Sequence, residues 1–224
     1  MDKIELMNNP LFNNLTDTDF KKAMTILNPT SKKYHKGTII LRAGETTTRL
    51  GIVLSGSVNI ESNDIWGNRS ILNHINKGQL FAEVYALLNP EIMLVDVIAN
   101  TDCEILFLDI SKLLSITGTT NSNFNKQITN TLLNNLLTIT ARKNLQLSKR
   151  SFHTAKKTIR SRVMSYLNSV SLQAGTNDFS IPYNRQQLAD YLNLERTALS
   201  KELGKMKKDR LISFHKNHFK ILDT

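Results

Sequence analysis

The chain has 224 residues, enough for one large domain or two modest ones, and a formal net charge of +10. Its apolar runs fall well short of the ~20 residues of a membrane span, and its first ten residues lack the apolar core of a signal peptide. Its one cysteine, Cys103, excludes an intrachain disulfide. We therefore expect a cytoplasmic protein with no membrane contact, in which Cys103 is a small core residue of a strand.

The positive charge is concentrated toward the C-terminal end. Residues 151–224 carry 13 lysines and arginines against 6 aspartates and glutamates, a net of +7, whereas residues 1–150 carry 16 against 13, a net of +3. This asymmetry suits a polyanion that the C-terminal part binds through phosphate contacts. An anionic membrane surface would instead need a basic amphipathic helix with a broad apolar face, which the sequence lacks outside its predicted cores.

Residues 1–120 predict a short helix followed by an antiparallel β-roll. The helical spacing ends before Pro29, and Asp17 or Thr18 can cap its start. From about residue 34 to residue 109, short β-rich runs such as RLGIVLSGSVNIES and CEILFLD alternate with glycines. Strands punctuated by glycine in this way are typical of a roll or barrel with tight turns.

Residues 121–153 have the pattern of one long helix. A heptad seam runs along it, formed by Leu133, Leu137, Thr140, Asn144 and Leu147. A second apolar stripe, formed by Leu132, Leu136 and Ile139, lies beside the seam. One stripe can pack on the roll, and the other needs a partner, for which a second copy in a parallel dimer is the simplest candidate. The alternative is a single broad apolar face on a monomer.

Residues 184–206, NRQQLADYLNLERTALSKELGKM, predict a helix-turn-helix. Asn184 can cap the first helix with Gln187 completing a capping box, and the helical pattern breaks at Asn193. In the second helix, at about residues 195–203, leucines face inward and a polar face remains outward, formed by Arg196, Thr197, Ser200 and Lys201. Such a helix can lie in the DNA major groove. A helical hairpin with a solvated polar face is the alternative interpretation.

The residues around the helix-turn-helix predict a small domain that ends in a β-hairpin. The polar segment 148–158 is typical of a hinge or of the end of the long helix, and Thr158 can cap a further helix. The β-rich halves of LISFHKNHFKILD, on either side of residues 215–217, predict a hairpin and therefore a winged helix. The predicted α+β chain has three parts, which are a roll at 1–120, a long helix at 121–153 and a winged helix-turn-helix at 154–224.

The whole layout resembles the CRP/FNR family of bacterial transcription regulators. YHKGTIILRAGE and GIVLSGSVNI are similar to the family's first roll strands, and KGQLFAE is similar to its G-x-x-F-G-E turn. RSRVMSYLNSV is similar to the first helix of its DNA-binding domain, and NRQQLADYLNLERTALSKEL to its helix-turn-helix. The resemblance covers nearly all of the chain. It implies an antiparallel roll of the double-stranded β-helix (jelly-roll) type with a sensory role, a long dimerisation helix and a C-terminal winged helix-turn-helix.

The resemblance also assigns candidate DNA contacts. The family's S-R-E-T-V-x-R pattern matches residues 195–201, so Arg196 and Lys201 take the places of its two base-reading arginines, although lysine lacks the rigid fork of arginine. Thr197 replaces a base-reading glutamate, and Glu195 replaces a small polar cap, for which it is a poorer side chain. For Glu202, the sequence suggests only a salt bridge. The candidate DNA-binding residues are Arg185, Arg196, Thr197, Ser200, Lys201 and Lys205, with further phosphate contacts from Lys207, Lys208, His215, Lys216 and His218.

The predicted effector site departs from the family. Glu83 keeps the position of a ribose-binding glutamate, but Met93 and Leu94 stand where the family's arginine and small polar residue hold a phosphate. Because a buried phosphate without a cationic partner is costly, we expect the roll not to bind cyclic AMP. The candidate pocket residues are Phe81, Glu83, Met93 and Leu94. A cyclic nucleotide bound at a rearranged phosphate site, with Arg42, Arg49 or Arg69 as the cation, is the alternative.

Other sensing groups of the family are also disfavoured. A cluster held by four thiolates needs more cysteines than Cys103, and His74 is a lone histidine of a predicted strand, which is more typical of a structural residue than of a haem ligand. No cofactor or metal is therefore assigned. An unidentified, apolar small molecule in the roll and a regulator without any effector both remain open.

These patterns together predict a homodimeric, sequence-specific DNA-binding regulator. Its operator should be a pseudo-palindrome with half-sites about 10 bp apart, and the resemblance implies RNA polymerase as a partner. A ligand-binding module whose winged helix contacts protein is one alternative. An enzyme is not expected, because the sequence has no nucleophile–base pairing, no phosphate-binding glycine loop and no zinc-ligand spacing.

Overall fold

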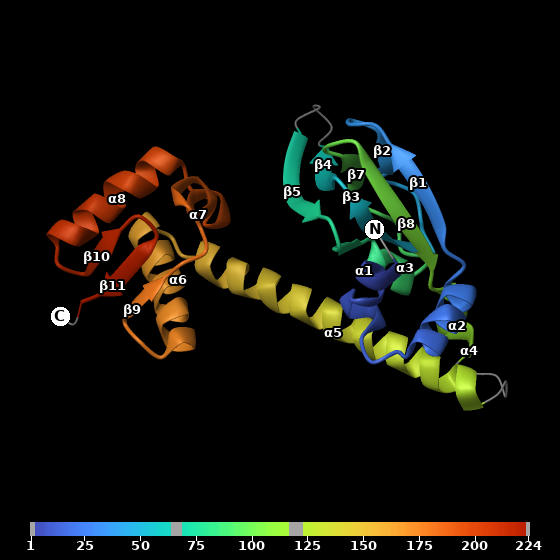
Figure 1. Ribbon diagram of the computed structural model, residues 1–224. Helices are drawn as coiled ribbons and strands as arrows, with labels where there is room; N and C mark the ends of the chain where they lie inside the picture. The colour runs from blue at the N-terminus through green and yellow to red at the C-terminus, as the bar shows by residue number, and fades with distance from the viewer. Residues whose placement is uncertain (1–2, 64–68, 117–122, 223–224) are drawn as a thin grey trace. The chain divides into compact units, whose positions relative to one another are not determined.

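The computed structural model describes residues 3–63, 69–116 and 123–222 (Figure 1). Contacts divide the chain into two compact units, Met1–Ala141 and Arg142–Thr224, and the boundary falls inside the long helix α5, Asn123–Thr154. The predicted α+β class is confirmed, because antiparallel sheets form the first unit and helices with a small antiparallel sheet form the second. The three-part division at residues 120 and 153 stays a prediction.

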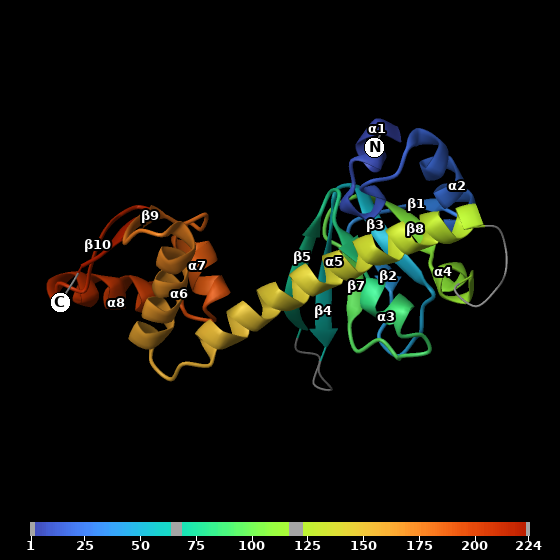
Figure 2. The ribbon, with the colours of Figure 1, turned by 90° about the horizontal axis from the view of Figure 1, so that it is seen from below.

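The first unit is built on two four-stranded antiparallel sheets, which face one another in Figure 2. One sheet has the order β1-β8-β3-β6 and the other has the order β2-β7-β4-β5. Their strands are β1 Thr30–Tyr34, β2 Ile39–Leu41, β3 Arg49–Ser55, β4 Ser57–Asn63, β5 Arg69–Asn76, β6 Leu80–Phe81, β7 Asp96–Ala99 and β8 Cys103–Asp109.

The central strands β3 and β8 are buried on both faces, and their nearly continuous apolar sequences suit this position. Val53 and Ile105 point between the two sheets, where they form one core. Leu50 and Leu108 alternate with them and form a second core with helices. Cys103 is buried in β8, as the sequence predicts.

Short helices surround the sheets of the first unit. They are α1 Lys3–Met7, a 3₁₀ helix Pro10–Phe12, α2 Asp17–Leu27, α3 Glu83–Leu87 and α4 Ser111–Ile116. The helix predicted before Pro29 is present as α2, but the expected caps are wrong. Thr16 is the cap, because its backbone is extended and its Oγ1 accepts a hydrogen bond from the Asp19 amide at 3.2 Å. Asp17 is therefore the first helical residue.

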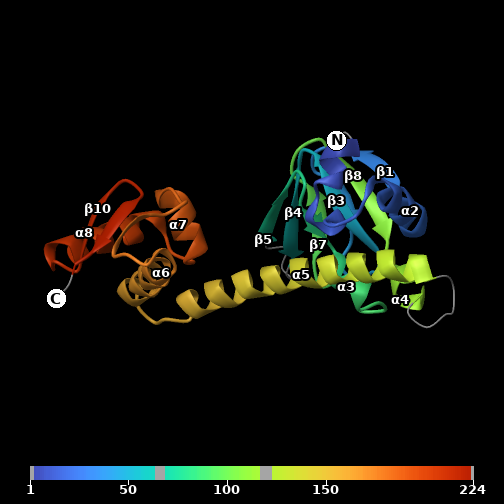
Figure 3. The same ribbon diagram turned by 60° about the horizontal axis from the view of Figure 1, so that its bottom comes forward.

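The N-terminal part of α5 packs along the first unit, beneath β3 and β8 in Figure 3. Leu132 and Leu136 are fully buried there, so the second apolar stripe of the sequence is the one that contacts the roll. On the heptad seam, Leu133 is partly buried against this core, whereas Leu137 is 66% exposed and Leu147 is 64% exposed. The seam therefore leaves large apolar side chains in solvent. None of the described helices is both long and apolar enough to cross a membrane.

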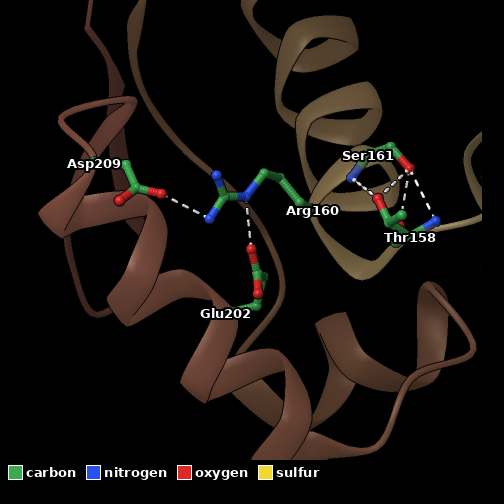
Figure 4. A network of polar contacts seen from close by, with 5 residues as sticks. All are labelled: Thr158, Arg160, Ser161, Glu202 and Asp209. Atoms are coloured by element: carbon green, nitrogen blue, oxygen red, sulfur yellow. Dashed lines mark hydrogen bonds and ion pairs between the residues drawn. The ribbon is translucent and has the colours of Figure 1, made fainter.

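The second unit contains the end of α5, three further helices and a three-stranded antiparallel sheet of order β10-β11-β9. Its elements are α6 Ile159–Ala174, β9 Asp178–Ser180, α7 Arg185–Tyr191, α8 Arg196–Lys208, β10 Ile212–His215 and β11 His218–Ile221. Thr158 caps α6 as predicted, in a capping box with Ser161 (Figure 4). The predicted hairpin is the pair β10 and β11, with Lys216 in a left-handed conformation at its turn.

Candidate nucleic-acid interface

Helices α7 and α8 form the predicted helix-turn-helix. The Asn184 Oδ1 accepts a hydrogen bond from the Gln187 amide at 2.9 Å, and the Gln187 Oε1 accepts one from the Asn184 amide at 2.9 Å. This confirms the capping box that the sequence predicts. The chain turns between the helices at Asn193, whose φ of 52° is left-handed and which belongs to the residue types that tolerate this conformation best.

Helix α8 has one buried face and one exposed cationic face. Leu199, Leu203 and Met206 are fully buried against α6, α7 and the sheet. The spacing of 3.6 residues per turn then directs the intervening side chains into solvent. The exposed residues are Arg196, Thr197, Ser200, Lys201 and Lys205. These five candidate DNA contacts thus lie on the accessible side of the helix.

Glu195 caps α8 more completely than its residue type predicts. Its carboxylate accepts hydrogen bonds from the Thr197 amide at 3.2 Å, from the Ala198 amide at 3.0 Å and from the Thr197 hydroxyl. These bonds, the Thr197 hydroxyl first, lower the pKa of Glu195 below its usual value, so the cap is ionised at neutral pH. Because the Thr197 hydroxyl donates to Glu195, its oxygen is left as a hydrogen-bond acceptor at the start of α8.

Glu202 forms the salt bridge that the sequence suggests (Figure 4). The Arg160 Nε lies 2.7 Å from the Glu202 Oε1, and the Arg160 Nη2 lies 2.7 Å from the Asp209 Oδ2. The hydrogen bonds to Glu202 and Asp209 raise the pKa of Arg160. Arg160 therefore connects the start of α6 to the middle and the end of α8, and Glu202 faces the protein rather than a ligand.

Arg185 lies between α7 and the tip of the hairpin. Its guanidinium is half-buried over the rings of Phe214 and Phe219, 5.2 Å and 5.8 Å from their centroids, and its Nη2 donates to the Lys216 carbonyl at 3.3 Å. Burial lowers the pKa of Arg185 below its ordinary value. A surface cavity of about 350 Å³ opens beside it, lined by Pro182, Asn184, Arg185, Gln187, Lys216 and Asn217. An anionic group in this cavity would meet two cationic side chains.

The remaining phosphate candidates, at the end of α8 and on the hairpin, are all exposed but differ in their contacts. They are Lys207, Lys208, His215, Lys216 and His218. Lys207 points toward the sheet, where its Nζ lies 5.6 Å from the centroid of the Phe214 ring. Both ring nitrogens of His218 have partners in the protein, since its Nε2 lies 2.6 Å from Asp178 and its Nδ1 contacts Ser180 at 3.0 Å.

Sequence analysis missed two arginines that contact the turn of the helix-turn-helix. Arg150 of α5 and Arg162 of α6 both donate hydrogen bonds to backbone carbonyls at the end of α7 and in the turn. The contacts join positions 30 to 43 residues apart, so no local spacing could reveal them. The only available signal was general: the last carbonyl groups of a helix need hydrogen-bond donors from outside the helix.

The candidate effector residues of the roll do not share one location. Phe81 and Met93 are buried in the core between the two sheets, and Glu83 is buried at the first residue of α3. Leu94 is 76% exposed, so it does not line the interior with Met93. The lone His74 is exposed, and its Nδ1 lies 2.8 Å from Asn59. Among the described residues, no three histidines, cysteines or carboxylates are grouped to hold a metal ion.

Two family models match the chain in the order in which the units occur. A model of the cyclic nucleotide-binding domain matches residues 31–119, and a model of the Crp-like helix-turn-helix domain matches residues 161–224. Among curated proteins, the chain is similar to the "Probable transcriptional regulator flp" of Lacticaseibacillus casei. The two are 27% identical over 217 residues, which cover 96% of this chain and 92% of that protein.

Solved structures share the fold at lower identity. The catabolite activator protein of Thermus thermophilus is 22% identical, with 95% of this chain and 93% of that chain covered and a TM-score of 0.51. The c-di-GMP responsive global regulator CLP of Xanthomonas campestris is 18% identical, with 93% and 100% covered and a TM-score of 0.50. Both likenesses extend over the roll, the long helix and the helix-turn-helix.

Proposed function

We propose a function for this chain from the family to which it belongs, the CRP/FNR family of DNA-binding transcription regulators. It acts in the cytoplasm as a homodimer that binds a pseudo-palindromic operator. The observation that carries this proposal is the exposed cationic face of α8, held outward by Leu199 and Leu203 on the buried face. A helix presented in this way fits the major groove, where side chains reach base edges.

Each candidate contact has a role that follows from its chemistry. Arg196 and Lys201 offer donors to guanine O6 and N7. Thr197 and Ser200 assist as acceptors, since the Thr197 hydroxyl donates to Glu195 and the Ser200 hydroxyl donates to the Arg196 carbonyl at 2.9 Å. Acceptors suit the amino groups of adenine or cytosine. Phosphate contacts would come from Arg185, Lys205, Lys208, His215 and Lys216, which fix the register on the duplex without reading sequence.

Dimerisation is proposed from the seam of α5. Leu137 and Leu147 are mostly exposed, and a second α5 packed along this seam would remove both from water. The dimer would place two copies of α8 in successive major grooves, so half-sites about 10 bp apart are expected. RNA polymerase is proposed as a further partner on the resemblance to the family alone.

We also propose that the roll does not respond to cyclic AMP. Met93 and Leu94 stand where the resemblance places the phosphate-binding pair, and neither can neutralise an anion. A phosphate buried in the roll without a cationic partner would lose its hydration and gain no compensating charge. Calorimetric titration with cyclic AMP should give no binding heat, and saturable binding that raises DNA affinity would contradict the proposal.

The DNA-binding proposal is tested by selecting ligands from a random double-stranded DNA pool with the full-length chain. The expected outcome is enrichment of one pseudo-palindrome whose half-site centres are about 10 bp apart. Enrichment of a single half-site would contradict the dimeric mode. A pool that is not enriched at all would contradict operator recognition and favour a winged helix that contacts protein.

A further inference from the structure

The carbonyl groups at the end of α7 are bound by arginines from two other helices. The last carbonyls of any helix lack partners within the helix and attract cations. Here the Arg150 Nε donates to the Tyr191 carbonyl at 3.0 Å, and the Arg150 Nη2 donates to the Asp190 carbonyl at 2.9 Å. The same Nη2 lies 2.9 Å from the Asn193 Oδ1. One side chain of α5 thus contacts three successive parts of the turn.

A second arginine binds the rest of the same turn. The Arg162 Nη1 donates to the Leu192 carbonyl at 3.3 Å and to the Asn193 carbonyl at 3.1 Å, and its Nε donates to the Lys156 carbonyl at 2.8 Å. Arg162 therefore links the turn both to α6 and to the loop that follows α5. Most of the hydrogen bonds that hold the turn between α7 and α8 are thus made to its backbone carbonyls.

The end of α5 is also anchored by packing. His153 is 2% exposed, and its ring lies 5.7 Å from the Tyr166 ring of α6 and 6.1 Å from the Tyr191 ring of α7. Its Nδ1 and Nε2 lie 3.0 Å and 3.2 Å from the hydroxyls of Ser165 and Ser169. Because these contacts involve two different helices, the last turns of α5 belong to the second unit, as the contact boundary at Ala141 also indicates.

These contacts change how α5 is connected to the recognition helix. Along the chain, α5 ends at Thr154 and α6 begins at Ile159, so a short loop is the covalent link. Arg150 provides a second, non-covalent connection, because its hydrogen bonds join α5 directly to the turn that precedes α8. A movement of the end of α5 would therefore be passed to α8 through a charged, multiply hydrogen-bonded contact rather than through a flexible connection.

We propose that Arg150 is a positioning residue for operator recognition. It makes the end of the dimerisation helix and the helix-turn-helix of the same chain one rigid body, and this fixes the distance between the two recognition helices of the dimer. The inference rests on the proposed dimeric binding to DNA. A rigid pair of recognition helices accepts only one half-site spacing, whereas a pair held by flexible loops accepts several.

The test measures the affinity of full-length protein for operators in which the half-site spacing is changed by one or two base pairs in either direction. Wild type should lose affinity about tenfold for each base pair, a difference of the size that one mismatched contact gives. Arg150→Ala should bind the best operator about tenfold more weakly and should vary less than about threefold across the series, because charge-assisted hydrogen bonds to the turn are lost.

Three further measurements separate positioning from charge and from folding. Arg142→Ala removes an exposed arginine of the same helix and should keep the wild-type spacing profile. Asn193→Gly keeps a residue that accepts the left-handed turn but removes one acceptor of Arg150, and should broaden the profile partly. Affinity for an isolated half-site should be the same in wild type and Arg150→Ala, since the groove-facing side chains are unchanged.

The outcomes that would overturn the inference are distinct from those that would overturn the function. If wild type discriminates spacing and both Arg150→Ala and Asn193→Gly do so equally, Arg150 does not position the recognition helix. If Arg150→Ala also loses the isolated half-site, the residue only supports the local fold, and the inference again fails. If wild type binds no operator at any spacing, the proposed function itself is wrong.

Discussion

The Glu195 carboxylate accepts hydrogen bonds from both the backbone amide and the hydroxyl of Thr197, at the first turn of α8. One residue thus ends the turn of the helix-turn-helix and orients a side chain that faces the DNA in the proposed complex. The two residues replace the family's small polar cap and base-reading glutamate, and together they keep a carboxylate at the tip of the helix. In the proposed complex, capping and base recognition would therefore be coupled at this position.

Removal of this cap should alter both stability and base preference. Glu195→Ala leaves the Thr197 and Ala198 amides without their partner and should lower the melting temperature, whereas Glu195→Ser retains a capping oxygen and should lower it less. In both variants the Thr197 hydroxyl no longer donates to Glu195, so it can donate a hydrogen bond to a base instead. The preferred base at one position of each half-site should therefore change. Thermal unfolding and DNA selection measure the two effects, and an unchanged selected sequence would contradict the coupling.

Charge on the exposed seam of α5 should separate the proposed dimer. Leu137→Lys and Leu147→Lys place an ammonium group where a second helix is expected to pack, which a buried interface does not tolerate. Sedimentation analysis should show monomers for these variants. Leu172→Lys is the matched control, because Leu172 is an 84% exposed leucine of α6 outside the seam, and it should leave the dimer intact. Dimers in all three variants would show that another surface is responsible.

The stability of the protein should depend on pH through His153. Burial, and then the charge of Lys149, lower the pKa of His153 below its ordinary value of 6.5. The unfolded chain therefore binds this proton at higher pH than the folded chain, and stability rises with pH across the interval between the two pKa values. The contribution of neutral His153 is fully present above about pH 6.5 and decreases on acidification below that value.

Thermal unfolding between pH 5 and pH 7.5 measures this dependence. His153→Gln should reduce the slope of the melting temperature with pH, because its amide does not titrate. His215→Gln removes an exposed histidine of the wing and should leave the slope as in wild type. Equal slopes in wild type and both variants would show that His153 keeps its ordinary pKa in the folded protein.

A methyl group at Gly51 should strain the core of the roll. Gly51 pairs with Phe81 across β3 and β6, and a Cβ at Gly51 would lie 2.1 Å from the Phe81 ring. Gly51→Ala should therefore lower the free energy of unfolding by about 1–3 kcal/mol, as overpacked cores do. Denaturant titration measures this change. The double variant with Phe81→Leu should recover part of the loss, and a fully stable Gly51→Ala protein would show that the ring moves freely.

Local sequence signals predicted the helix-turn-helix well because its determinants are close together in the chain. The capping boxes of Asn184 with Gln187 and of Thr158 with Ser161 each lie within four residues, and Asn193 marks the turn by its own backbone preference. Apolar spacing also separated the two stripes of α5. The predicted cap of α2, Asp17 or Thr18, lies one or two residues beyond the observed cap Thr16, an error typical of helix boundaries.

Interactions between distant segments could not be predicted in the same way. His153 lies in a polar segment without apolar periodicity, yet α6 and α7 enclose it. Arg150 and Arg162 find their acceptors only when the fold brings the turn to them. In the roll, two residues that are adjacent in sequence differ in burial, since Met93 is buried in the core and Leu94 is exposed to solvent. Both residues lie in the irregular segment before β7, where the β-rich spacing of the sequence cannot indicate which side chain is inside.

The most direct test of operator recognition compares wild type, Arg196→Ala and Arg142→Ala on the selected operator and on a scrambled duplex over a range of salt concentrations. Wild type and Arg142→Ala should prefer the operator, whereas Arg196→Ala should lose about tenfold or more of that preference, as expected for a base-reading arginine. All three should still bind the scrambled duplex, with an affinity that decreases as salt rises. An Arg196→Ala protein that prefers the operator as strongly as wild type would contradict the assignment of α8 as the helix that reads DNA.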